Sequence, residues 1–163
     1  MARVVPFDFD VPPSDAVYYP LYAKCAELGI PLQIQIGHSA QHFLPTVANP
    51  MTLDRVAIDF PELTIVGIHI GYPWVEEMIS VTWKHPNVYV GCDAHSPKYW
   101  DPSFIRFINS RRGQDKVLFG TDWPVIDFER AVNEIGELGL KEDVMKKLFW
   151  ENAIRVYGLE EGV

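Results

Sequence analysis

Long apolar runs are missing from this sequence. No stretch approaches the roughly 20 apolar residues that a membrane-spanning helix needs, and the first residues lack the apolar core of a signal peptide. We therefore expect a cytoplasmic protein with no membrane partner. Cysteine is also scarce: Cys25 and Cys92 are too few and too far apart for a disulfide scaffold or a zinc-knuckle pattern, so both are expected to be reduced thiols.

Basic residues are outnumbered. The chain has 14 lysines and arginines against 22 aspartates and glutamates, a net charge of −8, which argues against a nucleic-acid partner. Gly-x-Gly-x-x-Gly and Gly-Lys-Ser/Thr motifs are absent, so nothing in the sequence indicates a nucleotide phosphate loop. What remains, at 163 residues and 48% hydrophobic content, is a single globular domain over residues 1–163.

Short apolar runs alternate with segments of helical periodicity. Strand-like runs begin near residues 32, 64, 88 and 117, and the spacing predicts helices over 18–28, 52–58, 73–83, 102–111, 128–138 and 141–156. This order predicts an α/β fold with a parallel sheet. Each strand–helix unit takes roughly 25–35 residues, whereas a full eight-stranded barrel takes about 250. The chain therefore holds four units plus a fragment of a fifth before Pro6, either half of a (β/α) barrel or an open doubly wound sheet.

Polar side chains follow every predicted strand. In parallel α/β folds the reactive groups sit at the carboxyl ends of the strands, and imidazole and carboxylate groups there are suitable ligands for a divalent metal. Each also has a structural alternative, since an aspartate can cap a turn and a histidine can be a satisfied core residue. The residues in question are Gln35, His38, His69, the segment Cys92-Asp93-Ala94-His95, and Thr121-Asp122.

Aromatic residues gather just after the strand ends. They either line a pocket for a planar or apolar substrate or simply fill loops packed on the rim of the sheet. The residues are Tyr72, Trp74, Tyr99, Trp100 and Trp123.

Four segments together resemble the amidohydrolase-related family of the amidohydrolase superfamily. They are Phe60 to Gly71, Pro86 to Val90, Lys116 to Pro124 (which contains Phe119-Gly120-Thr121-Asp122-Trp123-Pro124) and Glu151 to Leu159. No single segment is diagnostic, but their order and spacing match the family from about Tyr19 to Leu159.

The resemblance implies a distorted TIM barrel with one divalent metal, zinc or manganese. Asp122 would be the carboxylate of the eighth barrel strand, a metal ligand and, in hydrolytic members, the base that takes a proton from water. His69 would be the histidine of the sixth strand, which polarises the substrate or transfers a proton. Gln35 or His38 would stand near the ligand position of the fifth strand. The substrate-binding candidates are His95, Trp123 and Tyr72.

Two departures from the family pattern concern the metal. The chain has no His-x-His pair, which family members carry on the first barrel strand, and Gln35 aligns with the metal-binding histidine of the fifth strand. An amide is a poor zinc ligand, although His38 lies three residues later. A catalytic zinc normally has three protein ligands, so the isolated chain either binds metal through a reduced set or does not bind it.

Three functions are compatible with these observations. The first is a metal-dependent hydrolase that acts on a small, cyclic or aromatic carboxylic substrate. The second is a non-oxidative decarboxylase of an unsaturated or aromatic acid, and the third is an inactive barrel fragment that serves as a binding or assembly module. Half a barrel would expose two parallel sheet edges; of the ways to cover them, we expect an edge-to-edge homodimer.

Overall fold

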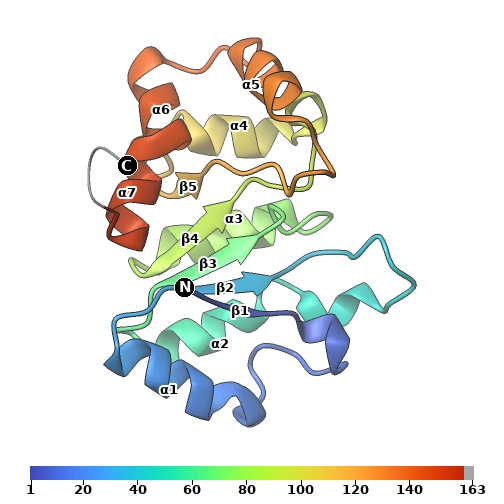
Figure 1. Ribbon diagram of the computed structural model, residues 1–163, viewed down its shortest axis with the longest axis vertical. Coiled ribbons are helices and arrows are strands. Elements are labelled where there is room, and N and C mark those ends of the chain that lie inside the picture. Colours follow the sequence, from blue (N-terminus) through green and yellow to red (C-terminus); the bar gives the residue numbers. More distant parts are fainter. Residues whose placement is uncertain (160–163) are drawn as a thin grey trace.

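A single five-stranded parallel sheet organises the chain, and the computed structural model describes residues 1–159 of it (Figure 1). The strands are paired in sequence order: β1 (Ala2–Val4), β2 (Leu32–Gln35), β3 (Ile65–Ile68), β4 (Val88–Gly91) and β5 (Val117–Leu118). Parallel strands in sequence order, with a helix after each of β2, β3 and β4, are the arrangement of a (β/α) barrel wall. The expected α/β class is confirmed, and β1 is the fragment of a fifth unit before Pro6.

Helices follow the strands along the chain. The α-helices are α1 (Tyr19–Glu27), α2 (Thr52–Asp59), α3 (Val75–Lys84), α4 (Pro102–Ile108), α5 (Phe128–Gly136), α6 (Glu142–Lys146) and α7 (Asn152–Tyr157). A π-helical turn, Lys147–Glu151, joins α6 to α7, and 3-10 turns occupy Pro6–Asp8, Ala16–Tyr18, Pro45–Ala48 and Pro97–Tyr99. No helix in the described part of the chain is long and apolar enough to cross a membrane.

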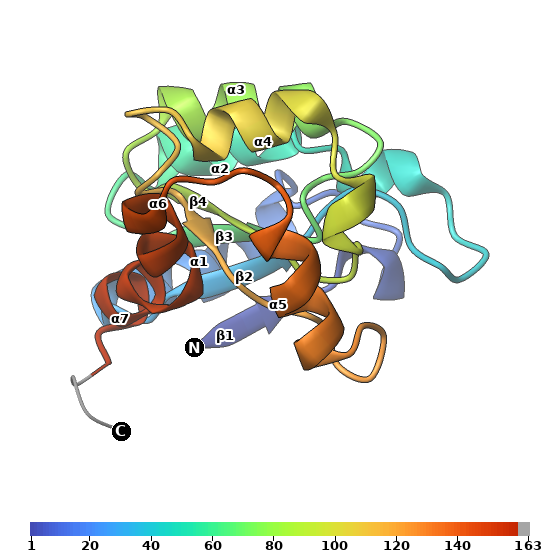
Figure 2. The same cartoon turned by 90° about the horizontal axis from the view of Figure 1, so that it is seen from above.

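The two faces of the sheet are covered differently. Alternate strand residues such as Ile34 and Ile65 point to the outer face and share the main core with Tyr22 of α1, Met78 of α3 and Phe104 of α4. The inner-face residues Val66, Ile68 and Leu118 form a second, smaller cluster with Val156 of α7. Figure 2 shows α3 and α4 on one side of the sheet and α7 near the end where the chain enters the strands. The carboxyl ends of the strands lie away from α7.

Local sequence determines several helix ends. Asp101 and Asp127 cap α4 and α5, because their side chains accept hydrogen bonds from the backbone N–H groups of Ser103 and Arg130. Three predicted boundaries are wrong by two or three residues: α4 ends at Ile108 rather than Arg111, α5 ends at Gly136 rather than Leu138, and α3 begins at Val75 rather than at Pro73. The preceding residues form a tight loop instead, in which the Trp74 N–H donates to the carbonyl of Gly71.

Candidate metal centre at the carboxyl edge of the sheet

Three side chains converge where β3, β4 and β5 end. His69 directly follows β3, Asp93 lies two residues after β4, and Asp122 follows the short strand β5. His69 Nε2 is 3.7 Å from Asp93 Oδ2 and 3.8 Å from Asp122 Oδ2. One nitrogen and two carboxylate oxygens, one from each residue, lie within 4.8 Å of one another.

The backbone around His69 is held in an uncommon conformation. His69 and Ile70 have φ values of 72° and 49°, in the left-handed region that non-glycine residues rarely adopt. Asp93 stabilises this conformation directly, because its Oδ1 accepts the backbone N–H of His69 at 2.8 Å. The other oxygen of Asp93 remains turned toward the imidazole ring.

Two glycines make room for Asp93. A Cβ at Gly91 would lie 3.1 Å from Asp93 Oδ1, and a Cβ at Gly120 would lie 3.1 Å from Asp93 Cβ. Both contacts are tighter than ordinary van der Waals separation. The absence of side chains at the ends of β4 and β5 therefore allows the carboxylate to fit between the strands.

The imidazole of His69 is buried and neutral. His69 is 7% exposed, and burial lowers its pKa below the ordinary value, although Asp93 and Asp122 act in the opposite direction. Its Nε2 has no hydrogen-bond partner among the described residues, since both carboxylates lie beyond hydrogen-bond distance. A buried ring nitrogen without a partner is costly, and it is the atom through which a neutral imidazole binds metal.

The spacing fits a divalent ion. Nitrogen and oxygen atoms bound to one zinc or manganese ion at about 2.1 Å lie roughly 3–4 Å apart, which agrees with the separations of 3.7 and 3.8 Å. One imidazole and two carboxylates are also a donor set that such ions accept. The residues present thus fit a metal ion with three protein ligands.

A cavity of about 390 Å³ opens beside the cluster. Its wall combines apolar surface with the polar residues Arg3, Gln35, His38, His69, His95 and Asp122. Arg3 belongs to β1, where the alternate residue Val4 is buried in the outer core, so the guanidinium group is on the inner, cavity side.

Three aromatic rings stand together at the mouth of this cavity. The ring centroids of His38, Tyr72 and His95 are 5.1, 5.5 and 5.3 Å apart. Gly37 makes the cluster possible, because a Cβ there would lie 2.5 Å from the carbonyl oxygen of Tyr72, to which the His38 N–H donates. Burial, with smaller contributions from His38 and His69, lowers the pKa of His95 to about 4, so its ring is neutral at pH 7.

The profile of the amidohydrolase family matches residues 2–159, almost the whole chain. The chain belongs to this family. An uncharacterised TIM-barrel protein from Bordetella bronchiseptica is similar to this chain at 37% identity and a TM-score of 0.80, over 90% of this chain and 52% of that one. A search of curated protein sequences gives no significant match.

More distant solved structures share the fold. A 5-carboxyvanillate decarboxylase from Novosphingobium aromaticivorans, complexed with manganese and 4-hydroxy-3-methoxy-5-nitrobenzoic acid, has 18% identity and a TM-score of 0.73 over 96% of this chain and 56% of its own. A dihydroorotase from Campylobacter jejuni has 17% identity and a TM-score of 0.67 over 94% of this chain and 55% of its own. The chain thus spans about half the length of these relatives, and its expected partial TIM-barrel fold is confirmed.

The structure brings most of the predicted site residues together. His69 and Asp122 are in the metal-fitting cluster, and Gln35, His38 and His95 line the adjoining cavity. His38 stands outside the cluster of ligand atoms. The two aromatic candidates differ: Tyr72 contacts the histidine rings, whereas Trp123 is 68% exposed and is not part of the cavity wall.

Two residues were not among the predicted site residues. Asp93 stands in a strand-end segment that the sequence singles out, but nothing in the sequence distinguishes it from its neighbours as the partner of His69. Arg3 lies in a strand of only three residues, too short for alternation to be recognised. The strand-end rule of parallel sheets is the signal that could have found Asp93; no such signal marks Arg3.

Proposed function

We propose that this chain carries the metal-binding and proton-transfer groups of an amidohydrolase-type enzyme. The observation that carries the proposal is His69 Nε2, a buried atom without a partner that is almost equidistant from two carboxylates. In this proposal a divalent ion, zinc or manganese, is held by His69, Asp93 and Asp122. Gln35 and His38, which the sequence suggested as ligands beside Asp122, line the adjoining cavity, and His38 lies outside the cluster of ligand atoms.

The ion would supply Lewis-acid activation and lower the pKa of water that it binds. The other steps belong to the protein. Asp122 borders the cavity with a side chain that is one-third exposed, so it can accept a proton from the attacking water. His69 acts as a ligand, because its neutral ring is buried and its free nitrogen faces the carboxylates.

The proposed substrate is a small carboxylic acid with a cyclic or aromatic body. Arg3 places a guanidinium group in the cavity wall, and arginine binds carboxylates through two parallel hydrogen bonds. The neutral ring of His95 and the rings of His38 and Tyr72 provide planar surfaces beside it. The proposed reaction is hydrolysis of a C–O or C–N bond.

Decarboxylation of an aromatic acid is the second candidate. It is favoured by the structural likeness to 5-carboxyvanillate decarboxylase and to a dihydroxybenzoic acid decarboxylase with bound manganese from Polaromonas. Incubation of the metal-loaded protein with a panel of lactones and hydroxybenzoates separates the candidates. Ring-opened acids support hydrolysis, and carbon dioxide with the matching phenol supports decarboxylation. If substrates of neither class are converted, the result favours the third function, an inactive barrel fragment that serves as a binding or assembly module.

Metal analysis of the purified protein tests the ligand set. We expect about one divalent ion per chain in the wild type, and its loss in His69→Ala, Asp93→Ala and Asp122→Ala. Asp143→Ala is the matched control, because Asp143 is an exposed aspartate on α6. A wild-type protein that binds no zinc or manganese, or an Asp93→Ala variant that keeps its ion, would contradict the proposal.

We also propose that the chain associates with a second copy through the edge of β1. Within residues 1–159 this strand pairs only with β2, while the N–H of Phe119, just beyond the opposite edge strand β5, donates to the carbonyl of Leu148. A free parallel edge is a template for another strand. Sedimentation should give a dimer that Arg3→Pro, which removes a backbone donor, converts to a monomer; a monodisperse wild-type monomer with a cooperative melt would refute this.

A further inference from the structure

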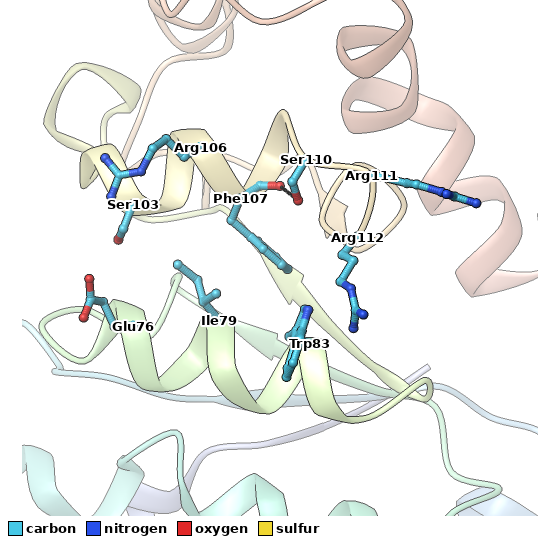
Figure 3. Close-up of a pocket in the computed structure, with 9 residues that line it drawn as sticks. All are labelled: Glu76, Ile79, Trp83, Ser103, Arg106, Phe107, Ser110, Arg111 and Arg112. Atoms are coloured by element: carbon cyan, nitrogen blue, oxygen red, sulfur yellow. Dashed lines mark hydrogen bonds between the residues drawn. The ribbon is translucent and has the colours of Figure 1, made fainter.

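A groove of about 560 Å³ runs along the outside of the molecule between α3 and α4. Figure 3 shows Glu76, Ile79 and Trp83 on α3 facing residues of α4 and the turn that follows it. The groove lies on the helical layer that covers the outer face of the sheet, so it is separate from the cavity beside His69, which opens at the carboxyl ends of the strands.

The floor of the groove is apolar and one of its aromatic rings is open to solvent. Ile79 and the buried ring of Phe107 form the floor, and Trp83 is 55% exposed beside them. A large exposed tryptophan at a concave site differs from the scattered apolar residues that most surfaces carry. Tryptophan is also among the residues most enriched at the energetic centres of protein interfaces.

The rim of the groove is positively charged in a protein whose net charge is −8. Arg106, Arg111 and Arg112 are exposed and line it. None of the three forms a salt bridge to a carboxylate within residues 1–159, whereas Arg55 and Arg130 each pair with an acidic residue of their own helix. The guanidinium groups of Arg111 and Arg112 are therefore free of ion pairs within residues 1–159, whereas Arg106 is close enough to Asp101 to contribute to the lowered pKa of that carboxyl.

One arginine is already placed by the tryptophan. The guanidinium carbon of Arg112 lies 4.4 Å from the centroid of the Trp83 ring, a cation–π contact that orients the group and leaves its N–H donors free. Among the described residues, the acidic member of the groove wall is Glu76 alone. It lies near the start of α3, away from Arg112, so the positive charge is strongest at the end that also carries the exposed ring (Figure 3).

We propose that this groove is a docking site for an acidic segment of a partner protein. The segment would insert one apolar or aromatic side chain between Ile79, Trp83 and Phe107, and its carboxylates would pair with the three arginines. The occupant is not expected to be the same groove of a second copy of the chain, because the two surfaces would place six arginines and only two glutamates in one interface, and the like charges would repel.

Selection from a displayed library of random short peptides tests the proposal. The wild-type protein is the bait, and the doubly substituted variant Trp83→Ala/Arg112→Gln is used for counter-selection. We expect the recovered peptides to be rich in aspartate and glutamate around one apolar residue. Their affinity should fall at least about tenfold in Trp83→Ala and in Arg112→Gln, and it should weaken as salt is raised.

Trp150→Ala and Arg55→Gln are matched controls, since Trp150 is 49% exposed elsewhere on the surface and Arg55 is already paired. Both should bind the selected peptides as the wild type does. Peptides without acidic residues, or peptides that bind the groove variants and the wild type equally, would overturn the proposal. Concentration-dependent self-association that is abolished by Trp83→Ala would also overturn it, because the occupant would then be a second copy.

Discussion

Gly67 lies inside β3, two residues before His69. Its substitution by alanine tests how tightly this strand is packed. A Cβ at this position would lie 2.7 Å from Ile36 Cδ1, 2.7 Å from Met78 Cε and 3.1 Å from Leu53 Cδ1. Carbon atoms in contact prefer separations of about 3.5–4.0 Å. Two methyl groups would therefore have to retreat by close to 1 Å each in a fully buried region.

The magnitude follows from three effects. Overpacking of a well-packed core costs about 1–3 kcal/mol. Replacement of glycine by alanine recovers roughly 0.5–1 kcal/mol through the unfolded chain, and the atoms that must move are the ends of flexible side chains. We expect Gly67→Ala to lower the free energy of unfolding by about 1–2 kcal/mol, which corresponds to a fall in Tm of roughly 2–8 °C for a chain of this size.

Urea unfolding followed by circular dichroism measures the effect as a lower midpoint at an unchanged m-value. Gly136→Ala is the control, because Gly136 is the last residue of α5 and a Cβ there meets no atom within 4 Å. That substitution should raise stability by roughly 0.5–1 kcal/mol. If Gly67→Ala is as stable as the wild type, or if both variants shift in the same direction, the packing argument is refuted.

Three further outcomes follow from buried polar groups and thiols. Asn152→Ala should lower the free energy of unfolding by about 2–3 kcal/mol in urea melts, because its buried amide donates two hydrogen bonds to backbone carbonyls, at 2.9 and 2.8 Å. Hydrogen bonds from Lys84 and His85 lower the pKa of Asp54 below its ordinary value of 3.8, so the stability that Asp54 contributes is present above pH 3.8 and is lost as the pH falls through the folded-state value. The stability difference between the wild type and Asp54→Asn should accordingly shrink in melts below pH 3.8. Cys25 and Cys92 are buried and burial raises the pKa of both thiols, so iodoacetamide at neutral pH should label them in the unfolded protein only, as read by mass spectrometry.

The central strand β3 was predictable because its residues are apolar on both faces, whereas the strand order was left open between half a barrel and a doubly wound sheet. The run from Thr64 to His69 predicts a buried strand, and β3 occupies Ile65–Ile68 with every residue buried. The two edge strands were harder to define. β1 has three residues and β5 has two, lengths at which hydrophobic periodicity carries little information.

The candidate site was predictable in position more than in geometry. The strand-end rule locates His69 and Asp122 at one edge of the sheet, but the bond from the His69 N–H to Asp93 depends on a left-handed residue that sequence patterns do not reveal. For Trp123, the position in the sequence led to a prediction of substrate binding that its exposure does not support. It follows Asp122 directly, yet the turn leaves it exposed, because adjacent residues at a sharp bend point in different directions.

The backbone is strained at the strand end that carries Asp122. Asp122 has a φ of 54°, a conformation in which a residue with a Cβ is less stable than glycine by about 1 kcal/mol. Strain of this kind persists where the side chain is needed. In EDTA, we expect Asp122→Gly to be more stable toward urea than Asp122→Ala by about 1 kcal/mol, and both to bind no metal. Equal stability of the two variants would mean that the turn at Asp122 is not strained. The argument that this strain is retained because the Asp122 side chain binds metal would then be refuted.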